Sequence, residues 1–188
     1  ARGIKDKNEG LTEPRFRTVA DFIFSGSQWK MRELAFGDQE VVFKPGDNKE
    51  NYAVKRMPEI EQWATDIYNF VAGKYGEENI VAFYVHLDET SPHIHCVLLP
   101  IKDGKFAFKE IFAGANNREY SQRTSKLHDE LAVVNEPWGL VRGTSQTETR
   151  QRHRPTEENR KQQSEECSSN EEELDTLNKA VSYLLVEI

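Results

Sequence analysis

Apolar residues recur at three- and four-residue intervals near the middle of the chain, which is the spacing of an amphipathic helix. They are Ile60, Trp63, Ala64, Ile67, Phe70 and Val71. Pro58 suits the first turn of such a helix, and Lys74-Tyr75-Gly76 supplies a basic last turn and a glycine stop. We therefore predict a helix from Pro58 to this stop that covers a sheet. A second helix is expected from about Arg118 to Val134.

Several shorter segments have the length and composition of β-strands. Residues 79–87 and 93–101 are rich in Val, Ile, Leu, Phe and Tyr, and the turn Asp88-Glu89-Thr90-Ser91-Pro92 joins them. Residues 17–24 are another strand candidate, and Asp103-Gly104 predicts a tight hairpin. Very short strands are expected at 41–43 and 140–141, and a short helix at 29–36.

The charge is distributed unevenly along the 188 residues, whose net charge is −7. Residues 162–188 contain seven acidic residues and one lysine, a net −6, which leaves −1 for residues 1–161. Within residues 142–161, six Arg and Lys face three Glu. The net acidity therefore does not argue against a nucleic-acid partner.

This pattern divides the chain into three parts. We expect a domain at residues 1–143, a basic-to-acidic linker at 144–169 and the start of a C-terminal helix or coiled coil at 170–188. The last part has apolar residues spaced 3, 4, 3 and 4, at Leu174, Leu177, Val181, Leu184 and Ile188. Such a seam suits either a homodimer or a helix that docks on its own domain.

The apolar runs and the cysteines indicate the compartment. No run approaches the ~20 residues of a membrane span. Cys96 and Cys167 lie far apart, which argues against a disulfide framework and favours a reducing cytoplasm. The start, Ala1-Arg2-Gly3, has no Met and no signal peptide, and we interpret it as a cut within a longer chain.

Three of the five histidines fall within ten residues, at His86, His93 and His95. Side chains alternate along a strand, so His93 and His95 face one side while Ile94 faces the other. If the two strands pair as neighbours, His86 reaches the same point. Three imidazoles around one point suit a divalent ion. Glu89, in the turn, could be a fourth ligand, an orienter of an imidazole or a base.

Other interpretations of these residues remain open. Asp88 is read as a turn former that bonds its own backbone. The chain could be an unrelated His-rich metalloprotein such as a cupin-like barrel, although its long helical stretches argue against a barrel. It could also be a non-catalytic DNA-docking and dimerisation module with a structural histidine cluster.

The segment His86-x-Asp88-Glu89-x-x-Pro92-His93-x-His95 resembles the metal motif of the Mob/Pre (MobV-type) plasmid mobilisation relaxases of the HUH endonuclease superfamily. The similarity extends over most of residues 17–161. It includes Ser25-Gly26-Ser27, the segment 108–114, and Leu140-Val141-Arg142-Gly143 followed by a basic stretch.

The resemblance implies an α+β fold with a five-stranded, largely antiparallel sheet and helices packed on one face. It implies nicking of one DNA strand at a plasmid or transposon transfer origin. His86, His93 and His95 would hold Mn²⁺ or Mg²⁺, with Glu89 beside them as ligand or proton acceptor. Single-stranded origin DNA would be the partner.

In that family the nucleophile precedes the metal motif, whereas no histidine precedes His86 here. We therefore expect that the front strand is missing and that this fragment lacks the nucleophile. Tyr52 is a weak candidate, and Tyr68, Tyr75 and Tyr84 are read as packing residues. Trp29, Trp63 and Trp138 are read as core. Sequence-independent DNA contacts are expected from Arg150, Arg152, Arg154, Arg160 and Lys161.

Overall fold

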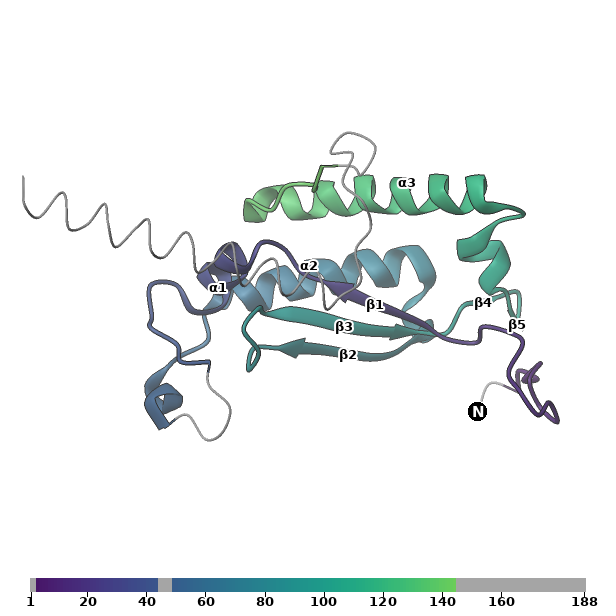
Figure 1. Cartoon of the computed structure of the whole chain (residues 1–188), viewed down its shortest axis with the longest axis horizontal. Helices are drawn as coiled ribbons and strands as arrows, with labels where there is room; N and C mark the ends of the chain where they lie inside the picture. The colour runs from purple at the N-terminus through teal and green to yellow at the C-terminus, as the bar shows by residue number, and fades with distance from the viewer. Residues whose placement is uncertain (1–2, 44–48, 145–188) are drawn as a thin grey trace, which may run out of the picture. The chain divides into compact units, whose positions relative to one another are not determined.

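The computed structural model describes residues 3–43 and 49–144. The chain forms two compact units, Ala1–Arg142 and Gly143–Ile188. The expected C-terminal helix, and the expected linker beyond residue 144, lie outside the described residues. The elements of the first unit (Figure 1) are β1 Ala20–Phe24, α1 Gln28–Phe36, η1 Lys49–Ala53, α2 Pro58–Tyr75, η2 Glu77–Asn79, β2 Ile80–His86, β3 His93–Leu98, β4 Ile101–Lys102, β5 Lys105–Phe106, η3 Lys109–Ala113, α3 Asn117–Asn135 and η4 Glu136–Trp138.

The main sheet has the strand order β1-β3-β2, and both strand pairs are antiparallel. The central strand β3 alternates strictly between half-buried and buried residues from His93 to Leu98. Ile94, Cys96 and Leu98 are fully buried and point to one side. One face of the sheet is therefore apolar, and the other face is left to polar groups.

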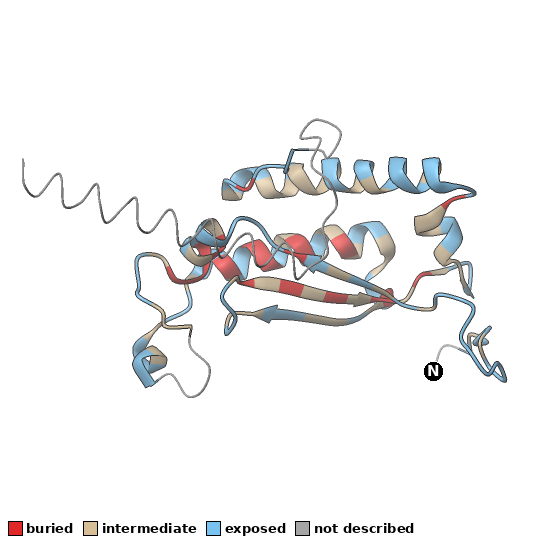
Figure 2. Ribbon diagram, viewed as in Figure 1, coloured by how far each residue is buried: buried red, intermediate tan, exposed pale blue. Residues whose placement is uncertain are grey.

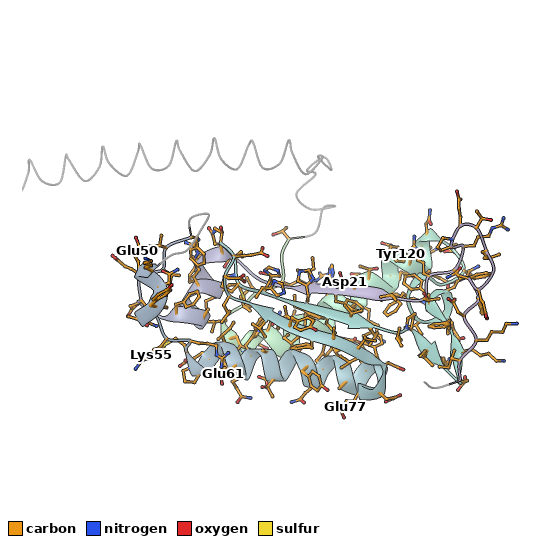
Figure 3. The ribbon with its side chains drawn as sticks, turned by 90° about the horizontal axis from the view of Figure 1, so that it is seen from below. Asp21, Glu50, Lys55, Glu61, Glu77 and Tyr120 are labelled. Atoms are coloured by element: carbon orange, nitrogen blue, oxygen red, sulfur yellow. The ribbon has the colours of Figure 1, made fainter. Side chains whose placement is uncertain are left out.

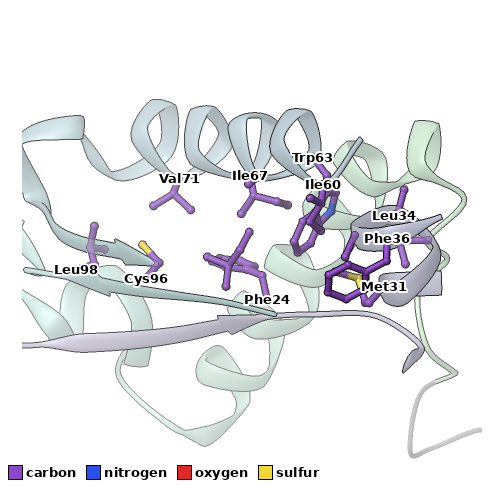
Figure 4. Packing of buried hydrophobic residues seen from close by; sticks show 14 residues of the cluster. Phe24, Met31, Leu34, Phe36, Ile60, Trp63, Ile67, Val71, Cys96 and Leu98 are labelled. Carbon is purple, nitrogen blue, oxygen red and sulfur yellow. The ribbon is translucent and has the colours of Figure 1, made fainter. Parts of the chain in front are cut away.

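Helix α2 covers the apolar face of the sheet. It begins at Pro58 and ends at Tyr75, before Gly76 at φ 88°, as the sequence predicted. Its buried residues Trp63, Ile67 and Val71 belong to the core cluster beneath the helix, in which Val71 lies over Cys96 and Leu98 of β3 (Figure 4). The buried positions accordingly concentrate on the facing surfaces of α2 and β3 (Figure 2).

Helix α3 lies along α2, on the same side of the sheet (Figure 1). Two indole groups tie its C-terminal end to α2. Trp63 Nε1 donates to Asn135 Oδ1 at 2.9 Å, and Trp138 Nε1 donates to Asp66 Oδ2 at 3.0 Å. An ion pair between Lys74 and Glu130 adds a third link. These contacts confirm the prediction that helices pack on one face of an antiparallel sheet. The described residues do not form the cupin-like barrel that was the alternative.

The structure departs from the expected strands in three places. Residues 41–43 form no strand because the Asn51 side chain bonds both the N–H and the C=O of Val42. Residues 140–141 also form no strand, and Leu140 is instead buried in the core. The expected five-stranded sheet is replaced, within the described residues, by three strands and a separate β4–β5 hairpin. Pro100, which lacks an N–H, separates β3 from β4.

The hairpin itself forms as predicted. Asp103 and Gly104 both have positive φ, at 50° and 70°, which is the geometry of a type I′ turn. Among the described residues, no helix combines the length and apolarity that crossing a bilayer requires.

The alternation on β3 predicts unequal stability effects for two isoleucines on opposite faces of the sheet. Ile94→Ala should lower the free energy of unfolding by about 2–5 kcal/mol, because it opens a cavity under α2. Ile23, 64% exposed on β1, is the control, and Ile23→Ala should change it by less than about 0.5 kcal/mol. Urea denaturation measures both values, and equal losses would contradict the described packing.

Candidate metal centre

The three clustered histidines come from adjoining ends of two paired strands. β2 ends at His86, β3 begins at His93, and these two residues are register partners. His95 lies two residues further along β3, and so on the same face as His93. The turn of residues 87–92 returns the chain between them. All three rings therefore meet at one end of the sheet, on the face opposite Ile94 and Cys96.

The three rings form a nearly equilateral triangle. Ring centroids are 5.0 Å apart for His86–His93, 5.0 Å for His86–His95 and 4.9 Å for His93–His95. One ring nitrogen from each lies within 4.8 Å of the other two. A point equidistant from atoms at that spacing is about 2.8 Å from each, compared with ~2.0–2.1 Å for a Zn–imidazole bond. Small side-chain rotations can close this difference.

An acceptor lies near the Nδ1 atom of each ring. His93 Nδ1 lies 2.9 Å from the Ser91 carbonyl oxygen, which can only accept, so Nδ1 carries the proton and Nε2 presents its lone pair. His86 Nδ1 lies 3.7 Å from Glu89 Oε1, and His95 Nδ1 lies 3.7 Å from Asp21 Oδ1. Such outer acceptors orient the imidazoles of metal sites and raise their basicity.

The position of Glu89 separates the roles that the sequence left open. Within the part of the chain that the structure describes, the group able to share one ion consists of the three histidines and does not include Glu89. The carboxylate instead faces His86 Nδ1, and its side chain is 61% exposed. Of the three roles considered for Glu89, this position fits a residue that orients the His86 ring.

Asp21 is a candidate site residue that the sequence analysis missed. It lies on β1 (Figure 3). The register of β1 with β3 places Ile23 opposite His95 and Asp21 opposite Val97. Asp21 is therefore the diagonal neighbour of His95 across the strand pair. The sequence feature that could have identified Asp21 is its position as the only carboxylate within the apolar strand Ala20–Phe24. Alternation along the strand places it on the face away from Phe22 and Phe24.

The aromatic residues divide between packing and exposed positions. The prediction that Tyr84 is a packing residue is wrong, because its side chain is 61% exposed. Tyr84 is the register partner of His95. Tyr75 does pack, its ring 5.9 Å from Phe22, and burial raises its pKa. Trp29, read as core, is 68% exposed, whereas Trp63 is fully buried.

The remaining candidates do not lie in the centre. Cys96 faces the core side of β3, and burial raises the pKa of its thiol to about 11, which suits a packing role. His128 is exposed on α3, as expected. Tyr52 is 75% exposed in η1. Arg150, Arg152, Arg154, Arg160 and Lys161 lie outside the described residues.

Comparison with known proteins supports one family. Plasmid recombination enzyme type 1 of Staphylococcus aureus is 33% identical over 105 residues, covering 55% of this chain and 25% of that protein. The plasmid recombination enzyme of Streptococcus agalactiae is 46% identical over 44 residues, covering 23% and 9%. The chain thus spans a quarter or less of the length of these relatives.

Among solved structures, the MobM relaxase domain (MOBV; Mob_Pre) bound to 26-nucleotide pMV158 oriT DNA has a similar fold. The TM-score is 0.50 at 21% identity, covering 79% of this chain and 72% of that one. The Mob_Pre family model, described as plasmid recombination enzyme, matches residues 27–162, well over half of the chain. The chain belongs to the Mob_Pre family of plasmid recombination enzymes.

Proposed function

We propose that this chain is the metal-binding part of a relaxase that nicks one DNA strand at the transfer origin of a plasmid or transposon. The observation that carries the proposal is the convergence of His86, His93 and His95 on one face of the sheet. Family membership supports the reaction class, and the MobM relaxase domain of similar fold is bound to oriT DNA.

The donor set favours Mn²⁺ over Mg²⁺. Mg²⁺ prefers oxygen ligands and keeps several waters, whereas imidazole suits transition metals. The three Nε2 atoms would hold the ion from one side and leave its other positions open. Neutral imidazoles leave the ion its full charge, and a bound ion of this kind polarises a phosphate oxygen as a Lewis acid.

The protein groups around the ion position the ligands and the substrate. The Ser91 carbonyl contacts His93 Nδ1, and the carboxylates of Glu89 and Asp21 lie 3.7 Å from His86 Nδ1 and His95 Nδ1. The face on which the rings lie also carries Ile23 and Tyr84, which are 64% and 61% exposed. A DNA strand can therefore approach from solvent and lie against apolar side chains beside the ion.

The proposed function extends to the partners of the chain and to its place in the cell. Single-stranded origin DNA is the partner, and Arg150, Arg152, Arg154, Arg160 and Lys161 supply further phosphate contacts. A homodimer is the pairing that the apolar spacing of residues 170–188 would suit, and these residues lie outside the described part of the chain. The cytoplasm, where plasmid DNA resides, is the place of action.

Removal of one imidazole tests the metal role. His93→Ala should weaken Mn²⁺ binding by more than about 100-fold, exceeding the ~10–100-fold typical of outer partners. Titration of Mn²⁺ followed by electron paramagnetic resonance of the free ion measures the change. His128→Ala removes an exposed histidine on α3 and should bind as the parent does. Equal affinities for the two variants would contradict the proposed site.

A substitution of Asp21 tests whether the carboxylates beside the imidazole rings strengthen metal binding. Asp21→Asn keeps the size of the side chain, removes its charge and should weaken Mn²⁺ binding about tenfold. Asp38→Asn, an exposed residue next to α1, is the matched control and should have no effect. An unchanged affinity in Asp21→Asn would remove Asp21 from the site.

We expect that this chain forms no covalent bond to the origin DNA. Tyr84 is the tyrosine opposite His95, yet its hydroxyl has no hydrogen-bond or ion-pair partner among the described residues that could activate it as a nucleophile. A labelled origin oligonucleotide incubated with Mn²⁺ should leave the chain on boiling in detergent. A label that stays attached would contradict this expectation, and its loss in Tyr84→Phe would assign the bond to that hydroxyl.

A further inference from the structure

A second concave surface lies away from the histidines. It is a groove of about 1040 Å³ formed by residues 7–17, the β4–β5 hairpin, η3 and the start of α3. Figure 1 shows β4 and β5 at the end of the sheet remote from α1, whereas the histidines lie at the end near α1. We call this surface the basic groove.

The basic groove carries a net positive charge of +4. Its lining includes six cations, Lys7, Arg15, Arg17, Lys102, Lys105 and Lys109, against the two carboxylates Asp103 and Glu110. Glu110 is paired with Lys102. Within the described residues, the other five cations have no salt-bridge partner. This excess of unpaired positive charge fits a polyanion.

Aromatic rings lie between these cations. Phe16 and Tyr120 are 49% and 48% exposed. Lys7 Nζ lies 5.7 Å from the centre of the Phe16 ring, and the Arg17 guanidinium lies 5.2 Å from that of Phe108. Exposed rings interleaved with cations suit a single strand, whose unpaired bases can stack on them while its phosphates meet the cations. A duplex keeps its bases stacked inside and gains little from such rings.

The N-terminal side of the basic groove is built by specific hydrogen bonds. Asn8 Oδ1 accepts from the N–H of Arg15 at 3.0 Å and of Phe16 at 2.9 Å, and Asn8 Nδ2 donates to the Phe16 carbonyl at 2.9 Å. Lys7 Nζ donates to the Phe106 carbonyl on β5 at 3.3 Å. Phe16 is therefore held in place before any ligand arrives, which reduces the ordering cost of binding.

We propose that the basic groove is a second binding site for single-stranded DNA, separate from the metal centre. Phosphates would meet Lys105, Lys109 and Arg15, and bases would stack on Phe16 and Tyr120. Lys102 follows His95 by seven positions, so the Cα atoms of these two residues are at most about 23 Å apart. The identification of DNA as the polyanion rests on the proposed function, whereas the preference for an unpaired strand rests on the exposed rings.

The test measures binding of a fluorescent 20-nucleotide oligo-dT by anisotropy, with EDTA present so that no divalent ion contributes. Lys105→Gln/Lys109→Gln should weaken binding about tenfold. The slope of log affinity against log salt should fall by about 1.4, since each single-strand phosphate contact contributes ~0.7. The control Lys49→Gln/Lys55→Gln makes the same charge change at exposed sites outside the groove and should leave both values unchanged.

The aromatic contribution is tested separately, after circular dichroism confirms that each variant is folded. Phe16→Leu should weaken oligo-dT binding about tenfold, and Phe16→Trp, which keeps a ring, should restore it. Neither should alter binding of a 20-base-pair duplex by more than about twofold.

Three results would overturn the inference: parental affinity and salt slope in the lysine variant, equal effects on duplex and single strand, or competition by poly-glutamate as effective as that by unlabelled oligo-dT. Because EDTA removes divalent ions, this assay does not depend on Mn²⁺ binding. Loss of metal binding and loss of groove binding are thus separate readouts, so either proposal can fail alone.

Discussion

The alternation of side chains along β3 is the constraint on which the rest of the structure depends. Ile94, Cys96 and Leu98 are fully buried under α2, and this burial determines which way His93 and His95 point. A shift of one residue in register would send the imidazoles into the core, where unpaired polar rings are costly. The stability of the apolar layer and the geometry of the candidate metal centre are therefore set by the same pairing.

The acceptors beside the Nδ1 atoms add a second constraint, on the orientation of the imidazole rings. Ser91 belongs to the turn before β3, Glu89 to the same turn, and Asp21 to the opposite edge strand. The acceptors beside the three imidazoles thus come from two backbone segments, the turn between β2 and β3 and strand β1, which come together only when β1 and β2 both pair with β3. This makes the centre a product of the complete sheet.

The sequence predicted the two long helices, the three strands of the main sheet and the histidine cluster because these depend on local periodicity. The helix from Pro58, the Asp103-Gly104 hairpin and the triad on two strands each follow from patterns within about twenty residues. Asp21 was missed because it approaches His95 only through strand pairing across 74 positions of the chain. Tyr84 was misread because β2 is an edge strand with an open face, which composition does not reveal.

The strand predicted at 41–43 failed for a related reason. Its apolar residues suit a strand, but the Asn51 side chain takes both backbone groups of Val42 that a partner strand would need. The burial of Leu140 likewise depends on a site formed by distant segments: a Cβ added at Gly26 would lie 2.4 Å from a Leu140 side-chain carbon. Neither contact could be predicted from the residues beside it.

The central claim, that β3 pairing brings three imidazoles to one cation, is tested most directly by anomalous diffraction from crystals soaked in manganese. The account predicts a single strong anomalous peak within about 2.0–2.3 Å of the Nε2 atoms of His86, His93 and His95. A peak bound elsewhere, or one that touches only one of these rings, would contradict it.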